Sequence, residues 1–330
     1  MQADRRALYN SLRMNWLLDT NLSVEPWQVE DYRTLSQEEI FARLNLHDLS
    51  LDKTSFLALS DQFDNPEDLT GHLLVDRDDD AVTQDQVYLL VFELWRRLLP
   101  EKPCISIFCD ELDHQIFMYD SGRIENTESI QDAIANLAVV LDENADQGNE
   151  PEVVFETICA GCANDLESFL YDFISEQIEE GNHTYATELL DDFSDYVQDV
   201  KWFEFLRAKL VGAHDEEGAN QLVHEMIHDV TSEPDFEYYI EVLAYMVQAG
   251  QEADFLYLVR KTVPLLECEE DFQDLLTICA DFYHRLDQEG VEAAIQAILQ
   301  KRAKNSFETV IDFKDPDIAE LFKVMEASPL

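Results

Sequence analysis

The chain has 330 residues, of which 71 are Asp or Glu and only 22 are Lys or Arg, so its formal net charge is -49. The acidic residues stand between regularly spaced Leu, Ile, Phe and Tyr, and 46% of the residues are hydrophobic. This pattern argues against a disordered acidic tail and predicts a folded protein with an acidic surface. The few, scattered basic residues disfavour direct binding to nucleic acid.

Nothing in the sequence indicates a membrane protein or a secreted disulfide-rich one. No apolar run reaches 18 residues, and the first 19 residues lack the uninterrupted apolar stretch of a signal peptide. We therefore expect no membrane partner and a cytoplasmic location. The six cysteines lie within apolar helical patterns, which is typical of reduced, buried thiols: Cys104, Cys109, Cys159, Cys162, Cys268 and Cys279.

The first part of the chain predicts helices of uneven length and spacing, over 4–18, 37–45, 51–62, 66–74 and 84–99. The segment 104–119 fits both a helix and a hairpin of two strands. We favour the helix, because Gly122 and a predicted helix over 128–142 would complete a helical hairpin. We divide the chain at the polar stretch 143–151, which predicts an N-terminal helical domain over 1–142 and a second domain over 152–330.

The second part of the chain has the regular spacing of an all-α protein built from stacked antiparallel helical hairpins, an α-solenoid. Apolar residues recur at helical spacing in four pairs of segments: 165–180 with 184–197, 202–211 with 218–230, 236–247 with 252–266, and 272–286 with 291–301. Glycines break the pattern about every 35 residues, the length of one helix-turn-helix repeat, at Gly181, Gly218, Gly250 and Gly290. A final helix after Pro316 would cap the array.

The region 165–302 resembles tetratricopeptide-like repeats. Large and small residues fall near that family's characteristic positions in the first unit at Leu170, Phe173, Ala186, Leu190 and Phe193, and in the second at Phe203, Leu206, Leu210, Ala219, Val223 and Met226. Ile174 and Arg207 replace the family's first-helix glycine, and only Pro234 approximates its terminal proline. The resemblance implies a scaffold whose concave face binds a peptide or a partner helix, and it implies no catalysis.

One short motif matches a known catalytic signature. His224-Glu225-Met226-Ile227-His228 has the HExxH pattern of zinc metallopeptidases, in which two His one turn apart bind zinc and the Glu polarises a water molecule. The remaining ligand of such a site could only be Glu237, Glu241 or Glu252, none at the usual spacing. We favour a solvent-exposed helix face, with a structural metal and a catalytic zinc as alternatives, and therefore expect no cofactor and no enzyme activity.

Two other patterns suit metals less well. The loop 76–80 is rich in Asp, as an EF-hand calcium loop is. Counted from Asp76, however, position 6 is Ala81 in place of the required glycine, and position 12 is Val87 in place of a bidentate carboxylate. The sequence therefore does not match a calcium-binding loop. We expect an acidic loop before a helix capped by Thr83. Cys159 and Cys162 form a lone CxxC without a second pair, for which we favour a place in the core over a metal or redox site.

These observations favour an adaptor or chaperone that binds a protein or peptide, possibly a basic one. The alternative is an acidic charge mimic, inhibitor or immunity protein that docks on a basic partner. First helices of successive hairpins line the concave face of such arrays. We therefore expect a partner surface formed by aromatic residues with neighbouring acids, against the alternative that the rings fill spaces between repeats: Trp202, Phe205, Tyr238 and Tyr239 with Glu204, Glu237 and Glu241.

Overall fold

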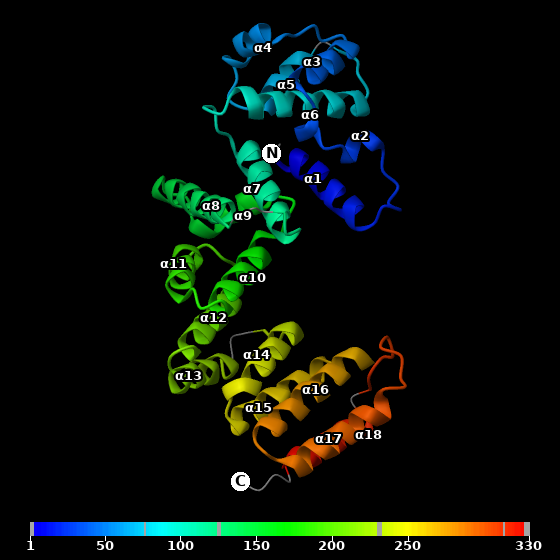
Figure 1. Ribbon diagram of the computed structural model, residues 1–330, viewed down its shortest axis with the longest axis vertical. Coiled ribbons are helices and arrows are strands. Elements are labelled where there is room, and N and C mark those ends of the chain that lie inside the picture. Colours follow the sequence, from blue (N-terminus) through cyan, green and yellow to red (C-terminus); the bar gives the residue numbers. More distant parts are fainter. Residues whose placement is uncertain (1–2, 76, 124–126, 230–232, 313, 327–330) are drawn as a thin grey trace. The chain divides into compact units, whose positions relative to one another are not determined.

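The computed structural model describes residues 3–75, 77–123, 127–229, 233–312 and 314–326 (Figure 1). Within these ranges the chain forms eighteen α-helices, two short 3-10 helices and no β-strand. The only strand-like feature described there is a single antiparallel bridge between Cys268 and Val310. The prediction of an all-α helical-repeat fold is confirmed.

The chain divides into two compact units. Unit 1 contains Met1–Leu170 and Asp195–Gln198, and unit 2 contains Tyr171–Ser194 and Asp199–Leu330. The helices up to the division are α1 Ala3–Leu18, α2 Pro26–Val29, η1 Tyr32–Thr34, α3 Gln37–Leu46, α4 Lys53–Ser60, α5 Pro66–Leu74, α6 Ala81–Leu98, α7 Ile105–Asp120, α8 Glu128–Asp146, α9 Pro151–Cys159 and α10 Leu166–Glu179. Helix α10 passes from unit 1 into unit 2.

Helix α6 forms the centre of the unit 1 core. Every residue from Val87 to Trp95 is buried, because α3, α5 and η1 all pack on this helix. Helix α7 packs against α1 and α8. The segment 104–119 is therefore a helix and not a strand hairpin, and its buried residues Cys109, Leu112 and Ile116 follow helical spacing.

The predicted linker 143–151 is a tight turn between two helices that pack on each other, α8 and α9. Residues 143–146 continue α8, Gly148 adopts a left-handed conformation with φ of 92°, and Pro151 is the first residue of α9. The division between the compact units falls later, within α10.

Unit 2 is built from successive helical hairpins. Its helices are α11 His183–Phe193, α12 Val200–Gly212, α13 Glu216–Ile227, α14 Phe236–Ala249, α15 Glu252–Thr262, η2 Val263–Leu265, α16 Glu269–Arg285, α17 Glu289–Arg302 and α18 Pro316–Glu326. Helix α14 contacts both α12 and α16, while α13 contacts α15. First helices thus pack on first helices and second helices on second helices, as in a stacked repeat array.

The four glycines of the predicted repeat boundaries occupy two different kinds of position. Gly181 follows α10 with φ of 81°, and Gly250 ends α14. Gly218 and Gly290 lie inside the first turns of α13 and α17 instead of between helices. Another glycine, Gly212, ends α12 where an added Cβ atom would overlap the Tyr245 hydroxyl of α14.

Arg302, which is buried at the end of α17, stabilises the last hairpin through ion pairs. Its guanidinium donates to Glu269 at the start of α16 over 2.8 and 2.6 Å, and to Asp315 and Asp317 at the start of α18 over 2.8 and 3.0 Å. Helix α18 also packs along α17. One arginine therefore joins three helices of unit 2. None of the helices that the described residues form is long and apolar enough to cross a bilayer.

Candidate functional site

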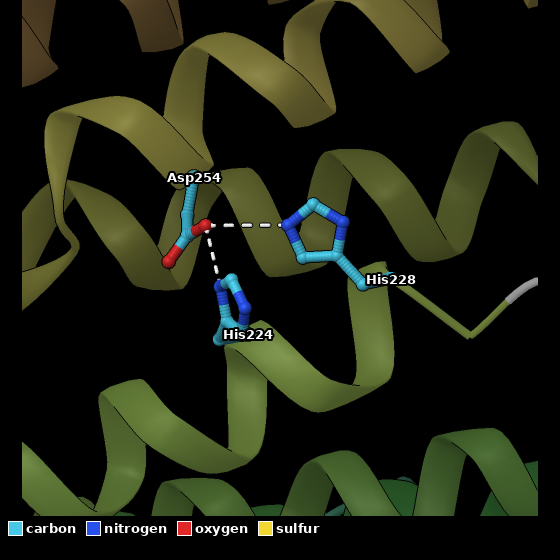
Figure 2. Close-up of side chains that lie close together, drawn as sticks. All are labelled: His224, His228 and Asp254. Carbon is cyan, nitrogen blue, oxygen red and sulfur yellow. Dashed lines mark hydrogen bonds and ion pairs between the residues drawn. The ribbon is translucent and has the colours of Figure 1, made fainter.

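The two histidines of the HExxH motif meet an aspartate from the next hairpin. His224 Nδ1 lies 2.8 Å from Asp254 Oδ1, and His228 Nε2 lies 3.5 Å from the same oxygen. Figure 2 shows both imidazole rings turned toward this carboxylate. One nitrogen from each ring and one Asp254 oxygen all lie within 4.8 Å of one another. This group is a set of donors that could hold a metal ion.

The local sequence explains why these side chains converge. Helix α13 buries Ala219, Val223 and Ile227, so His224 and His228 lie along the edge of its exposed side. Helix α15 begins after Gln251 and buries Phe255 and Leu258 within its first turns. Asp254 lies on the first turn of α15 and is itself buried, because α15 packs on α13.

The site differs from the metallopeptidase arrangement considered from the sequence. None of Glu237, Glu241 and Glu252 belongs to the group of three, and Glu241 instead lies 3.9 Å from Lys209 Nζ. The catalytic glutamate of the motif, Glu225, is exposed and accepts a hydrogen bond of 3.1 Å from Gln221 Nε2. Asp254 was not among the predicted ligands, because metallopeptidases of this kind use a Glu as the remaining ligand. Its spacing of 30 residues from His224, about one repeat, was the available signal.

A second pair of histidines, with no such carboxylate among its described contacts, lies one hairpin earlier. His183 Nδ1 is 2.8 Å from His214 Nε2, and the two rings meet edge to face with centroids 4.6 Å apart. Among the described residues, only His224, His228 and Asp254 form a group of three or more close metal-binding side chains. The two pairs therefore provide a natural comparison of a carboxylate-bearing site with one that has imidazoles alone.

Three of the four aromatic residues predicted to bind a partner lie in the core of unit 2, and Trp202 packs against that core. Phe205, Tyr238 and Tyr239 are 0%, 3% and 7% exposed, and Trp202 is partly buried. The Trp202 ring meets Tyr171 of α10 and Tyr238 of α14 edge to face, with centroids 5.1 and 5.2 Å apart. These rings pack between first helices, and of the four only Trp202 keeps part of its surface exposed.

The acids predicted beside those rings are partly engaged with cations. Glu204 is exposed and lies 3.7 Å from Arg207, one turn along α12. Glu241 lies near Lys209 as described above. Two of the predicted acids, Glu204 and Glu241, therefore each lie within 4 Å of a basic side chain.

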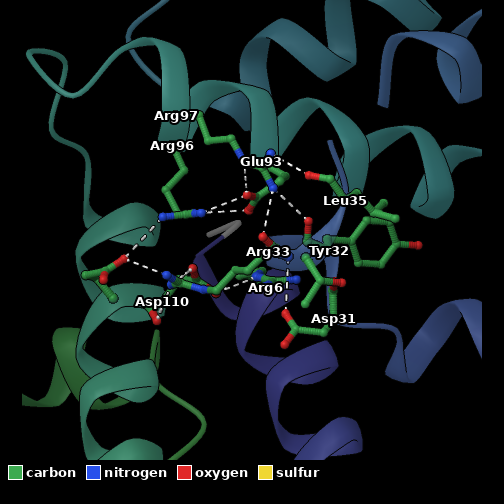
Figure 3. A network of polar contacts seen from close by, with 11 residues as sticks. Arg6, Asp31, Tyr32, Arg33, Leu35, Glu93, Arg96, Arg97 and Asp110 are labelled. Atoms are coloured by element: carbon green, nitrogen blue, oxygen red, sulfur yellow. Dashed lines mark hydrogen bonds and ion pairs between the residues drawn. The ribbon is translucent and has the colours of Figure 1, made fainter. Parts of the chain in front are cut away.

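Unit 1 contains a buried polar network that the sequence did not indicate (Figure 3). Asp110 of α7 accepts hydrogen bonds of 2.6 Å from both Arg6 of α1 and Arg33 of η1. Burial alone would raise the pKa of Asp110, but the positive charges of Arg6 and Arg33 outweigh it and lower the pKa to about 2. The carboxylate is therefore ionised throughout the neutral range.

The same network continues to α6. Glu93 is 1% exposed and pairs with Arg96 and Arg97, which follow it at helical spacings of three and four residues. Arg97 also donates to the carbonyl oxygens of Tyr32, Arg33 and Leu35 over 3.0, 3.1 and 2.6 Å. A pocket beside Asp110 is lined in part by Arg6, Arg13 and Arg33. Each of these arginines already has a carboxylate partner, so the pocket offers no free positive charge to an anion.

The CxxC thiols, Cys159 and Cys162, are partly exposed, whereas a place in the core was expected. Burial raises the pKa of the Cys159 thiol to about 12, and a hydrogen bond with Cys109 is the main cause of the raised pKa of Cys162. Neither thiol is therefore a ready nucleophile. In the acidic loop, Asp76 lies outside the described residues. Asp80 rather than Thr83 caps α6, because its carboxylate accepts the Thr83 N–H over 2.8 Å.

Comparisons with known proteins give no family for this chain. No family model, no curated protein and no solved structure matches it. The tetratricopeptide-like resemblance is thus supported only at the level of a helical-repeat fold.

Proposed function

We propose that this protein is a non-enzymatic adaptor or chaperone that binds a basic protein partner. The observation that carries the proposal is the charge of the α8–α9 hairpin in unit 1. Residues 128–159 contain eight acidic residues and no Lys, Arg or His. All eight are exposed: Glu128, Asp132, Asp142, Glu143, Asp146, Glu150, Glu152 and Glu156.

The contacts of this hairpin support an acidic surface that is available to a partner. In the part of the chain that the structure describes, no ion pair involves Asp132, Glu143 or Glu156. The same two helices also expose Val139 and Val153, at 52% and 55%. Unpaired carboxylates would orient a Lys- or Arg-rich segment and accelerate its association, while exposed valines would add apolar contact area.

The proposal is tested by identifying proteins retained on the immobilised chain and measuring the affinity of the purified partner. The triple variant Asp132→Asn, Glu143→Gln, Glu156→Gln should weaken binding about 10-fold in 50 mM NaCl and less in 300 mM NaCl. The matched control Glu270→Gln, Asp274→Asn, Asp281→Asn removes the same charge from exposed positions of α16. It should change the affinity by less than about 2-fold.

Equal effects of the two triple variants would contradict the assignment of the hairpin, and retention only of proteins without a basic surface would contradict the proposal. Poly-lysine measures non-specific attraction to the whole chain and should respond equally to both variants. Competition between this protein and nucleic acid for the partner would favour the second candidate, a charge mimic that occupies a nucleic-acid-binding site.

A further inference from the structure

We propose that His224, His228 and Asp254 bind one divalent transition-metal ion of the zinc type, which links α13 to α15. This inference is independent of the proposed partner-binding function, because the three residues belong to unit 2 and the acidic hairpin belongs to unit 1. The ion would stabilise the stacking of two successive hairpins and would not act in hydrolysis.

The donor set matches the chemistry of zinc. Imidazole nitrogens and a carboxylate oxygen are ordinary zinc ligands, with metal–ligand distances of about 2.0–2.2 Å in a tetrahedral arrangement. Such an arrangement separates neighbouring ligand atoms by about 3.3–3.6 Å. The two separations from Asp254 Oδ1 are 2.8 and 3.5 Å. The two imidazole nitrogens lie within 4.8 Å of each other, so a turn of the His224 ring, whose side chain is 55% exposed, toward His228 would bring the three donors to this spacing.

The surroundings hold the donors in place without blocking the site. Asp254 is anchored by the burial of its helix, and its side chain is 12% exposed. The His228 ring packs against Tyr257, which lies on α15 like Asp254. The two ring centroids are 4.0 Å apart and the planes are inclined at 37°. These contacts fix two of the three ligands, as supporting contacts commonly do around protein metals. The exposed His224 leaves room for water as a fourth ligand.

Charge also favours occupancy. Without a metal, one Asp254 oxygen is shared between two imidazoles whose centroids lie 4.3 Å apart. A dication between the three groups would interact with all of them at once. The formal net charge of -49 would raise the local concentration of cations at the surface.

The test is zinc binding by the full chain after removal of metal with a chelator, measured by competition with a chromophoric indicator in 150 mM NaCl and 5 mM MgCl2. Magnesium occupies exposed carboxylates, which are oxygen sites, and competes poorly for imidazole. We expect one zinc ion per chain. Cobalt bound in its place should give the intense visible absorption of a tetrahedral site.

Two variants and a matched control locate the ion. Asp254→Asn, and separately His224→Gln, should weaken zinc binding at least about 100-fold, since each removes a ligand. The double variant His183→Ala, His214→Ala removes two imidazoles of the other pair and should leave the affinity within about 2-fold. Zinc should also raise the melting temperature of the unaltered chain by about 5 °C, and should not raise that of His224→Gln.

The proposal is overturned if the unaltered chain binds no stoichiometric zinc, if both ligand variants retain its affinity, or if the control loses as much affinity as they do. The His224→Gln variant keeps the test decisive should Asp254→Asn fail to fold, because His224 is more than half exposed and contributes little to the core.

Discussion

The two units use their scarce basic residues in opposite ways. In unit 1, a single carboxylate, Asp110, is surrounded by two arginines, Arg6 and Arg33. In unit 2, a single arginine, Arg302, is surrounded by the carboxylates of Glu269, Asp315 and Asp317. In the first centre two arginines share one buried carboxylate, and Arg33 also pairs with the partly exposed Glu111. In the second, three carboxylates share one buried arginine, and Asp317 also pairs with the exposed Lys301.

The difference shows which residue each unit depends on. A chain with 22 basic residues cannot neutralise 71 acidic ones, and these centres place arginines where a carboxylate is hidden from water. Removing a charge from a buried cluster is costly because the partners left behind remain poorly solvated. The cluster in which three carboxylates share one buried arginine should therefore be the more vulnerable of the two.

The largest effect is expected from Arg302→Met. This variant keeps much of the side-chain volume but leaves three neighbouring carboxylates without their shared cation. We expect the free energy of unfolding to fall by about 4 kcal/mol, measured by urea titration of the full chain. As a control, Arg260→Met breaks the ion pair with Glu326, in which both side chains are 55% exposed. It should cost less than about 1 kcal/mol, and equal losses in the two variants would contradict the comparison.

A smaller loss is expected from Asp110→Asn, which removes the buried carboxylate shared by Arg6 and Arg33, while Arg33 keeps its pair with Glu111. The free energy of unfolding should fall by about 3 kcal/mol at pH 7. The pKa of Asp110 is lowered to about 2 in the folded chain, so its ionised form stabilises the fold fully above about pH 4. That contribution is lost as the pH falls through about 2. Urea titrations at pH 7, 5 and 3 should show that the difference in free energy of unfolding between the natural chain and Asp110→Asn becomes smaller at pH 3. A difference that stays constant with pH would contradict the role of the Asp110 charge.

A gain in stability, and not a loss, is expected from replacing Glu67. This buried carboxyl group of unit 1 accepts hydrogen bonds from hydroxyl groups. It accepts hydrogen bonds of 2.9 and 3.2 Å from Tyr88 and Ser106. Burial raises the pKa of Glu67 and outweighs the lowering by these bonds, so ionisation opposes folding as the pH rises above about 4.5. Glu67→Gln should therefore increase the free energy of unfolding at pH 7 by about 0.5–1 kcal/mol.

The gain from Glu67→Gln should shrink toward pH 4.5, where the natural carboxyl becomes protonated. A loss of stability at pH 7 would show that the hydroxyl groups stabilise the charged form more than burial disfavours it. Parallel urea titrations of Glu67→Gln and Asp110→Asn therefore separate a carboxylate held by cations from one held by neutral donors.

The smallest effect concerns exposed acids, which neither centre neutralises. Raising NaCl from 20 to 300 mM should increase the melting temperature by about 2–5 °C, because screening weakens repulsion while apolar contacts persist. The α8–α9 triple variant and the α16 triple variant should both show a smaller increase, and by similar amounts. An unchanged or lower melting temperature of the natural chain at 300 mM NaCl would contradict charge repulsion as a source of instability.

Much of the fold was predictable because helical spacing of apolar residues is a local signal. This spacing predicted the ends of α10 to α17 to within a few residues, and it correctly assigned the segment 104–119 as a helix, α7. Helix α9 was not predicted, because its first residues adjoin a polar stretch with the composition of a linker. Helix α2 has four residues, too few to show a period.

The candidate site was only half predictable. The spacing of His224 and His228 was visible in one helix, but Asp254 approaches them through packing between hairpins. The same reason explains the burial of two of the predicted aromatic residues: Phe205 and Tyr238 begin first helices as expected, yet those helices are covered by neighbours on both sides. The arginine centres join residues up to 104 positions apart, which no local pattern reports.

Gly212 lies at a close contact between two successive hairpins. The Tyr245 hydroxyl lies so close to the position of its missing Cβ that even a methyl group would push α14 away from the end of α12 or force the ring to turn. The close approach of the Tyr245 ring to the end of α12 therefore depends on the absence of a side chain at this position. An engineer who wished to lengthen the array by copying this repeat would need to copy the glycine and the tyrosine together.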